Sequence, residues 1–142
     1  MPTSNADAAW EGGLKNGKGH FHASSGAFDG NYSAGTRFGG EKGTNPEELL
    51  AAAHASCLSM AIAAGLDAAG TPATRISTSA ACTNEKVSDG YAVTRMRLTV
   101  RGQVPGIDQA QFKQAAETAK NGCPISRALK NNLEIELDAA LE

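Results

Sequence analysis

The sequence predicts an α+β fold formed by one domain, residues 1–142. The length suits a single domain, and no repeat, linker or low-complexity segment divides the chain. Helical segments and alternating, strand-like segments are mixed without the strand–helix–strand rhythm of a parallel α/β protein. With 41% hydrophobic and 20% charged residues, the chain is expected to be globular rather than disordered.

The first third of the chain is rich in glycine and predicts short strands separated by turns. Ala8–Trp10 can begin a strand, and Gly19–Ala23 alternates as a second one. Residues 27–33 indicate a third short strand after a Ser-Ser-Gly turn. Arg37 follows among glycines, so we expect it on a mobile or tightly turned loop.

A long helix is predicted from Pro46 to about Ala69. Thr44 or Asn45 can cap its start, where proline is also favoured at the first helical position. The sequence Gly-Thr-Pro at residues 70–72 ends it.

The predicted long helix is rich in Ala, Leu and Met on nearly all sides. A helix of this kind is normally buried on most of its faces. His54, Ser56 and Ser59 interrupt the apolar stretch, whereas a membrane span would be more uniformly apolar. We therefore expect a buried helix and no association with a membrane.

The second half predicts, in order, two strands, two helices and a last strand. Asp108 can cap the first of these helices, and Pro124 can begin the second. The expected ranges are residues 75–83, 91–104, 109–120, 124–130 and 133–137.

Charge and composition exclude several classes of partner and location. The net charge is −2, aromatic residues make up 5%, and no basic block is present, so a nucleic-acid partner is not expected. The polar, acidic N-terminus lacks a basic region followed by an apolar stretch, so no secretory signal is visible. We expect a cytoplasmic protein.

The three cysteines, Cys57, Cys82 and Cys123, are the first candidates for chemistry. An odd number argues against a secreted disulfide framework, and their spacing does not fit a zinc finger. In a reducing compartment a disulfide is usually transient and catalytic. Cys82 is expected on a strand and is interpreted as a spectator.

Cys57 and Cys123 differ in their expected surroundings. Cys57 lies in the middle of the long helix, three residues after His54, so an activated thiolate there needs a positive neighbour. Cys123 is expected at a helix N-cap, where backbone N–H groups favour a thiolate. The pair could be an attacking and a resolving thiol, or Cys57 could be a small core residue unrelated to Cys123.

Arg37 and Glu47 are the charged candidates. An arginine beside Cys57 would stabilise a thiolate and orient a peroxide oxygen, but Arg37 could equally be a solvated surface residue. Glu47 could hold the guanidinium in place. The preference for acidic residues at a helix start explains Glu47 equally well.

These candidates stand in segments that resemble one known family. The segments read TRFGGEKGTNPEEL at residues 36–49, AAHASC at 52–57, VPGID at 104–108 and GCPIS at 122–126. Together they resemble the OsmC/Ohr family, the osmotically inducible and organic hydroperoxide resistance proteins. The resemblance runs from Trp10 to the last strand. The short spacing from Arg37 to the Asn-Pro-Glu helix start is more similar to the OsmC branch.

The resemblance implies an intertwined homodimer in which a long central buried helix packs against an antiparallel sheet. It implies that Cys57 is the peroxidatic thiol, that Cys123 is the resolving thiol, and that Arg37 and Glu47 organise a site at the subunit interface. It also implies that no metal or flavin is used, and that an external dithiol, notably a lipoylated protein, restores the thiols. Cys82 is not part of the family pattern.

The implied cluster conflicts with the geometry of a straight helix. Ten residues separate Glu47 from Cys57, which is about 15 Å along a helix axis. Both side chains cannot touch one substrate from the same unbroken helix. Either the helix bends, or the partner chain supplies Glu47 or Arg37. We expect the second arrangement, a composite site across the dimer.

The sequence thus predicts a thiol peroxidase of oxidative and osmotic stress defence. It would reduce organic hydroperoxides and hydrogen peroxide through a Cys57 sulfenic acid and a Cys57–Cys123 disulfide. A non-enzymatic binding or stress protein with buried cysteines is the main alternative. A hydrolase or acyltransferase that uses Cys57 with His54 is a second alternative, but no oxyanion hole is apparent.

Overall fold

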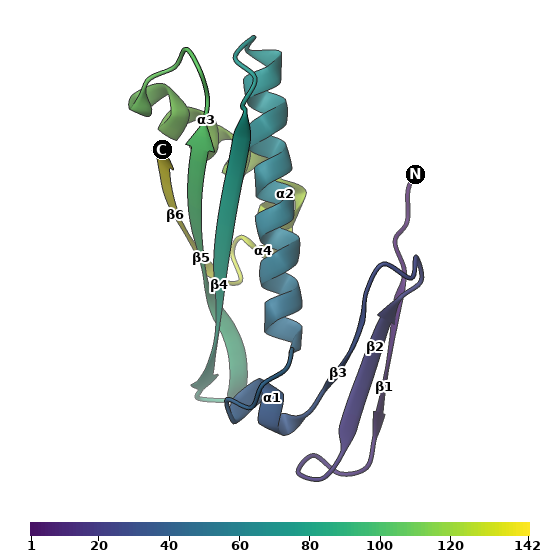
Figure 1. The fold of residues 1–142 in the computed structure, drawn as a ribbon. Coiled ribbons are helices and arrows are strands. Elements are labelled where there is room, and N and C mark those ends of the chain that lie inside the picture. The colour runs from purple at the N-terminus through teal and green to yellow at the C-terminus, as the bar shows by residue number, and fades with distance from the viewer. The chain divides into compact units, whose positions relative to one another are not determined.

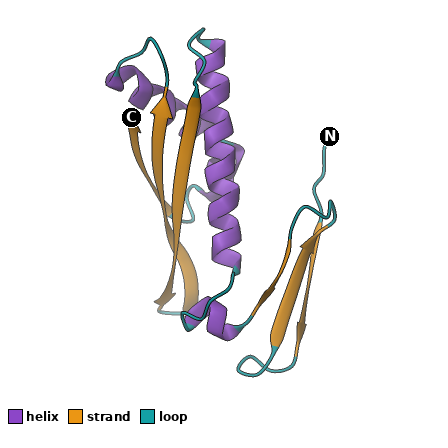
Figure 2. Ribbon diagram, viewed as in Figure 1, coloured by secondary structure: helices purple, strands orange, loops and turns teal.

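The computed structural model describes residues 1–142, which form two compact units, Met1–Leu49 and Leu50–Glu142. Six strands and four helices are present, and the strands form two three-stranded sheets (Figures 1 and 2). The predicted α+β class is confirmed. The expectation that residues 1–142 form a single domain stays a prediction.

The first unit is built on an antiparallel sheet of β1 (Ala6–Glu11), β2 (Lys18–Ala23) and β3 (Asp29–Tyr32). Side chains alternate along β2, so that residues 19, 21 and 23 are buried and their neighbours are exposed. Aromatic rings pack over this face, with the Trp10 and Tyr32 centroids 5.6 Å apart. Glycine is required at position 19, because a Cβ there would overlap the Tyr32 ring.

The loop expected around Arg37 is instead a short helix, α1 (Ala34–Phe38). Ser33 and Thr36 cap its start reciprocally: the Thr36 N–H donates to Ser33 Oγ at 3.2 Å, and the Ser33 N–H donates to Thr36 Oγ1 at 2.9 Å. The expectation of a loop was therefore wrong. These local hydrogen bonds outweigh the helix-breaking tendency of the nearby glycines.

The long helix is α2 (Pro46–Ala68), which ends one residue before the predicted limit. Asn45 is the cap, since its Oδ1 accepts the Glu48 N–H at 2.9 Å. Gly70 has a φ of 76°, and the Thr71 N–H donates to Leu66 O at 2.9 Å, which closes the C-terminal end.

Within one chain, α2 is buried along a single stripe rather than on most of its faces. The buried side chains recur every four residues, at His54, Leu58, Ile62 and Leu66. Met60 on another face is 77% exposed. By length and composition alone α2 could cross a membrane, but its stripe packs into the core of the second unit.

The second unit is built on a sheet in the order β4-β5-β6. β4 (Arg75–Val87) and β5 (Gly90–Gln103) form an antiparallel hairpin, and β6 (Glu134–Leu141) is parallel to β5. The parallel pair departs from the expected antiparallel sheet. It arises because two helices, α3 (Gln109–Gly122) and α4 (Pro124–Leu129), carry the chain back before β6 begins.

Charge pairs lie across the two parallel strands in the observed register. Arg97 lies opposite Glu136, and its Nε donates to Oε2 at 2.8 Å. Arg101 Nη2 reaches Asp138 Oδ2 at 2.9 Å in the same way. A shift by one residue would turn every side chain of β6 to the other face of the sheet.

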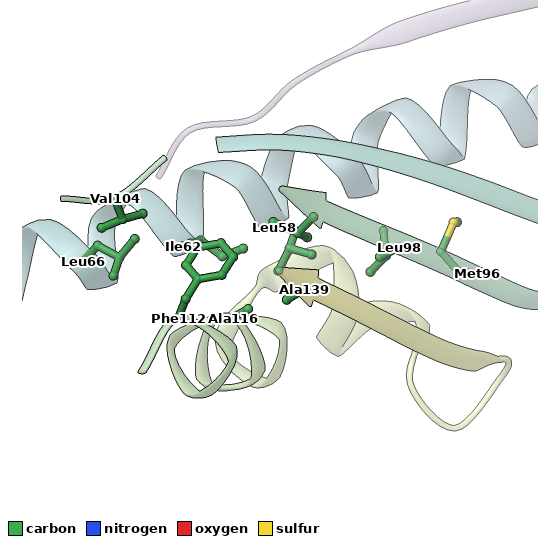
Figure 3. Packing of buried hydrophobic residues seen from close by; sticks show 10 residues of the cluster. Leu58, Ile62, Leu66, Met96, Leu98, Val104, Phe112, Ala116 and Ala139 are labelled. Atoms are coloured by element: carbon green, nitrogen blue, oxygen red, sulfur yellow. The ribbon is translucent and has the colours of Figure 1, made fainter. Parts of the chain in front are cut away.

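The core of the second unit lies between α2, α3 and the sheet (Figure 3). The side chains of Leu58, Ile62 and Leu66 from α2 point toward Phe112 and Ala116 of α3 in this view. β5 and β6 close the other side with four buried apolar side chains, those of Met96, Leu98, Val100 and Ala139. This packing holds α2 and the segment after α3 in fixed positions.

Phe112→Ala is expected to lower the free energy of unfolding by about 3–5 kcal/mol. The ring is fully buried and lies over Gly102, which has no side chain to fill the space that the ring leaves. Thermal unfolding at one fixed protein concentration measures the effect. Lys113→Ala, at the next, exposed position of α3, is the control and should change stability by less than about 0.5 kcal/mol. Equal stability of the two variants would contradict this description of the core.

Candidate active site

The structure brings two of the three cysteines into contact. Cys57 lies in the middle of α2, and Cys123 lies between α3 and α4. The Cys123 Sγ donates to the Cys57 Sγ at 2.9 Å, and both residues are free thiols. A disulfide bond is about 2.05 Å long, so the sulfurs need to approach by less than about 1 Å to form one.

The position of Cys123 follows from the residues on either side of it. The backbone N–H of Cys123 still donates to Ala119 O at 2.8 Å and so closes α3. Pro124 cannot continue that helix, but it begins α4 at its first position, with Cys123 as the N-cap. Cys123 is therefore held by two helices at once.

The two thiols differ in exposure. Cys123 is fully buried, whereas Cys57 is half-buried. Within one chain Cys57 is therefore the more accessible residue of the two. This order of access matches the roles that the family resemblance implies for them.

Their acidities also differ within one chain. Burial raises the pKa of Cys57, and the hydrogen bond with Cys123 raises it further, while the Ile125 N–H opposes both. Burial would also raise the pKa of Cys123, but hydrogen bonds from Cys57 and from Ser126 outweigh burial and lower it. The Ser126 contacts lack the geometry of a regular N-cap bond. No cation is among the groups that shift the pKa of Cys57.

His54 does not act as a direct partner of Cys57. Its Nε2 lies 2.7 Å from the Ser126 Oγ, and both side chains are buried. Burial lowers the pKa of His54, so the imidazole is neutral at physiological pH. Sequence reasoning missed Ser126, although it lies in the Gly-Cys-Pro-Ile-Ser segment, because nothing local predicts a partner 72 residues away.

Arg37 and Glu47 form a second pair, in the first unit. Arg37 Nη2 donates to Glu47 Oε1 at 2.6 Å, and Arg37 Nε donates to both carboxylate oxygens at 3.1 and 3.2 Å. The Glu47 side chain is 10% exposed and that of Arg37 is 37% exposed. A forked ion pair of this kind fixes the guanidinium plane and leaves one edge of it accessible.

Arg37 also lines a cavity of about 340 Å³ in the first unit. Most of its other walls are apolar or aromatic, and they consist of Trp10, Leu14, Tyr32, Ser33, Ala34 and Phe38. Sequence reasoning did not select these residues. The strand pairing of the N-terminal sheet brings Trp10 and Tyr32 together, and no local pattern predicts it.

The remaining cysteine lies away from the thiol pair in the fold. Cys82 is on β4, opposite Met96 of β5, and packs partly against the core. No group of three or more His, Cys, Asp or Glu side chains is arranged to hold a metal ion.

Comparison with known proteins decides the family. The family described as "OsmC-like protein" matches residues 39–138. The chain is 47% identical over 136 residues to a protein named peroxiredoxin OsmC of Escherichia coli (strain K12), covering 95% of this chain and 94% of that protein. The chain belongs to the OsmC-like family. The resemblance seen in the sequence is thereby confirmed.

Proteins of the Ohr branch are also similar to this chain, at lower sequence identity. An organic hydroperoxide resistance protein of Xanthomonas axonopodis pv. citri is 30% identical over 118 residues, 80% of either chain. Among solved structures of OsmC-like and Ohr proteins, the organic hydroperoxide resistance protein OsmC of Legionella pneumophila has a TM-score of 0.82 at 22% identity, covering 99% of this chain and 98% of that one. OhrB of Bacillus subtilis has a TM-score of 0.76 at 23% identity, covering 95% of this chain and 97% of that one. At these identities the two structures support the fold alone.

Proposed function

We propose that this chain reduces organic hydroperoxides with Cys57 as the attacking thiol and Cys123 as the resolving thiol. As a member of the OsmC-like family with a relative named peroxiredoxin, it is a cysteine-based peroxidase of stress defence. The roles of the individual residues are our proposal. The observation that carries it is the 2.9 Å contact between the two free sulfurs.

The reaction proceeds in three balanced steps. The Cys57 thiolate attacks one peroxide oxygen, the O–O bond breaks, and the alcohol leaves with a proton from solvent while the sulfur becomes a sulfenic acid. Cys123 attacks that sulfur, an S–S bond forms, and the hydroxyl leaves as water. An external dithiol then opens the disulfide by exchange and is itself oxidised to a disulfide.

Two thiols and an external dithiol account for all the electrons, so we propose no metal or flavin. A dithiol is favoured as the reductant because it closes its own disulfide after the exchange. A lipoylated protein is our candidate for it. The reducing cytoplasm is the location where such a cycle is sustained.

The aromatic cavity beside Arg37 favours an organic substrate. Its walls bury an alkyl or aryl group, while the guanidinium can donate to a peroxide oxygen. Hydrogen peroxide has no apolar part to bury. We therefore expect organic hydroperoxides to react at least as well as hydrogen peroxide.

Cys57 needs a cation that its own helix does not supply. Within one chain its pKa is raised, yet the thiolate is the reactive form. Helix α2 is unbroken from Pro46 to Ala68, so Glu47 lies about 15 Å from Cys57 along its axis. We propose that the Arg37–Glu47 pair of one chain serves Cys57 of a second copy.

The exposed apolar surface supports a homodimer. β1 is exposed along its whole length, at the edge of a sheet of only three strands. Apolar residues on the free faces of α2, such as Met60, are exposed as well. A second copy of the chain would cover both surfaces and complete the site.

A mixture of two inactive variants tests the composite site. Cys57→Ser and Arg37→Ala chains, unfolded together in equal amounts and refolded, should regain about 25% of wild-type activity. Half of the dimers are then mixed, and each mixed dimer has one site with both an intact Cys57 and an intact Arg37. Peroxide consumption measures this, and each variant refolded alone is the control. If the site lies within one chain, every site in the mixture is damaged and no activity returns.

The peroxidase proposal is tested by consumption of cumene hydroperoxide in the presence of a dithiol. We expect sustained turnover, and less of it with a monothiol at equal thiol concentration. A binding protein with buried cysteines would leave the peroxide unchanged. The hydrolase alternative is not favoured, because His54 is bonded to Ser126 rather than to Cys57.

A further inference from the structure

His54 and Ser126 form a buried polar pair that the proposed peroxidase cycle does not use. His54 projects from α2 one turn before Cys57, and Ser126 projects from α4 one turn after Cys123. Their 2.7 Å contact joins the same two helices as the contact between the sulfurs. The two contacts lie next to each other, because Ser126 follows Cys123 by three residues, about one helical turn, at the start of α4.

We propose that His54 positions the Ser126 hydroxyl to donate a hydrogen bond to Cys123, which raises the fraction of Cys123 present as thiolate and makes Cys123 a better leaving group. This rests on the proposed function, because it assigns a role to the resolving thiol of that cycle. Ser126 is the group that contacts the reacting sulfur. His54 acts through Ser126 and is a positioning residue.

The burial of His54 Nδ1 determines which atom donates in the His54–Ser126 hydrogen bond. His54 Nδ1 is buried and has no hydrogen-bond partner. A buried N–H without an acceptor is costlier than an unpaired lone pair, so the hydrogen is assigned to Nε2. His54 Nε2 then donates to Ser126 Oγ, and the Ser126 hydroxyl hydrogen is free to point to the Cys123 sulfur. Burial keeps His54 neutral, so this direction persists at physiological pH.

The resolution step needs such a donor. While Cys57 is a thiolate, Cys123 can remain protonated and donate to it across the 2.9 Å contact. Oxidation of Cys57 to a sulfenic acid removes that negative charge. Cys123 must then lose its proton as its sulfur attacks, and the hydroxide that leaves Cys57 takes up one proton, so that one water is formed overall. When the external dithiol attacks Cys57, Cys123 leaves as the thiolate that Ser126 again stabilises.

Three cationic side chains share a cavity with Ser126. Lys120 of α3 and Arg127 and Lys130 of α4 line a cavity of about 280 Å³ together with Ser126. β6 contributes Ile135 to the same cavity, which is apolar. Only Cys57 among the ionisable side chains is bonded to Cys123 directly. Ser126 and His54 are therefore the groups whose removal should change the acidity of Cys123.

The test is the titration of Cys123 as the only thiol of the protein. In a Cys57→Ser, Cys82→Ala background, ultraviolet absorbance of the thiolate reports Cys123 directly and requires no peroxidase activity. Ser126→Ala should raise the titration midpoint by about one pH unit or more, because a hydrogen bond to a charged group is lost. His54→Leu should raise it in the same direction. His54→Gln, which keeps an N–H donor but cannot titrate, should stay within about half a pH unit of the parent.

Three outcomes are distinguished, after thermal unfolding has shown which variants fold. A rise with Ser126→Ala and His54→Leu, and none with His54→Gln, supports the proposal. An unchanged midpoint in Ser126→Ala, or a rise in His54→Gln equal to that in His54→Leu, overturns it. If Ser126→Ala does not fold, the comparison of the two His54 variants decides alone.

A second measurement separates this proposal from the peroxidase proposal. In the otherwise wild-type protein, Ser126→Ala should slow formation of the Cys57–Cys123 disulfide about threefold at neutral pH, since the less acidic thiolate is rarer but more nucleophilic. The rate at which peroxide oxidises Cys57 should not change. If the wild-type protein forms no disulfide, the proposed function fails. If both proteins form it equally fast at every pH, only the role of Ser126 fails.

Discussion

Cys57→Ser is expected to reduce the consumption of cumene hydroperoxide by at least about a thousandfold, because a serine hydroxyl is a far weaker nucleophile than a thiolate. Cys57 is the half-buried sulfur of the pair, and Cys123 behind it is fully buried, so no other thiol of the pair can replace it. Serine is close to cysteine in size, so the fold should be preserved. The loss should appear in the first turnover as well as in the steady state.

Cys82→Ala is the matched control for that variant. It removes a thiol of similar partial exposure from β4, outside the thiol pair, and should keep nearly wild-type activity. If Cys57→Ser consumed the peroxide at the wild-type rate, the attacking role of Cys57 would be wrong. If Cys82→Ala lost activity to the same extent, the chemistry would have to be assigned to Cys82 instead.

Cys123→Ser has the second largest expected effect, and it concerns turnover rather than the first reaction. The first equivalent of peroxide should be consumed at nearly the wild-type rate. The Cys57 sulfenic acid then has no partner sulfur within reach, since Cys123 is the thiol in contact with it. Further peroxide should convert it to the sulfinic acid, which an added dithiol does not reduce.

Stopped-flow measurement of peroxide consumption, followed by mass spectrometry of the protein, separates the two phases. A gain of two oxygen atoms on the Cys57 peptide is expected in Cys123→Ser and not in wild type with dithiol present. Sustained turnover of Cys123→Ser at the full rate with the dithiol would show that the external thiol resolves Cys57 directly. Cys123 would then have no resolving role.

Local signals predicted the long helix and its limits well. The Asn-Pro-Glu start and the Gly-Thr-Pro end of α2 are both determined by neighbouring residues, and the structure differs by one residue at the C-terminal end. The helix around Arg37 was missed because the glycines beside it received more weight than the capping box of Ser33 and Thr36. Thr36 stands where the usual sequence signature of a capping box has Glu or Gln, so the signal in the sequence is weak.

Long-range pairing could not be predicted in the same way. β6 is parallel to β5 because α3 and α4 lie between them, and the register places Arg97 opposite Glu136; neither is a local property of β6. The burial of α2 has a similar cause. Its composition is apolar on all sides, but the chain itself covers only one stripe of it.

In the candidate site, too, local signals were predicted and long-range contacts were not. Residue types and spacing marked Cys57, Cys123, Arg37 and Glu47 as separate candidates, and only the resemblance to a family grouped them. The structure brings Cys57 into contact with Cys123, which is 66 residues away in the sequence. It also pairs Arg37 with Glu47, which is 10 residues away. The bond between His54 and Ser126 was not predicted, because its partners are joined only by the packing of α4 against α2.

The central claim is that Cys57 and Cys123 form a catalytic disulfide. It is tested most directly by mass spectrometry of the fully reduced protein after reaction with an equimolar amount of cumene hydroperoxide, with free thiols trapped and the digest mapped. We predict a fast Cys57–Cys123 disulfide that is absent in Cys57→Ser, with Cys82 recovered as a free thiol. Unchanged thiols, or oxidation spread evenly over all three cysteines, would contradict the account.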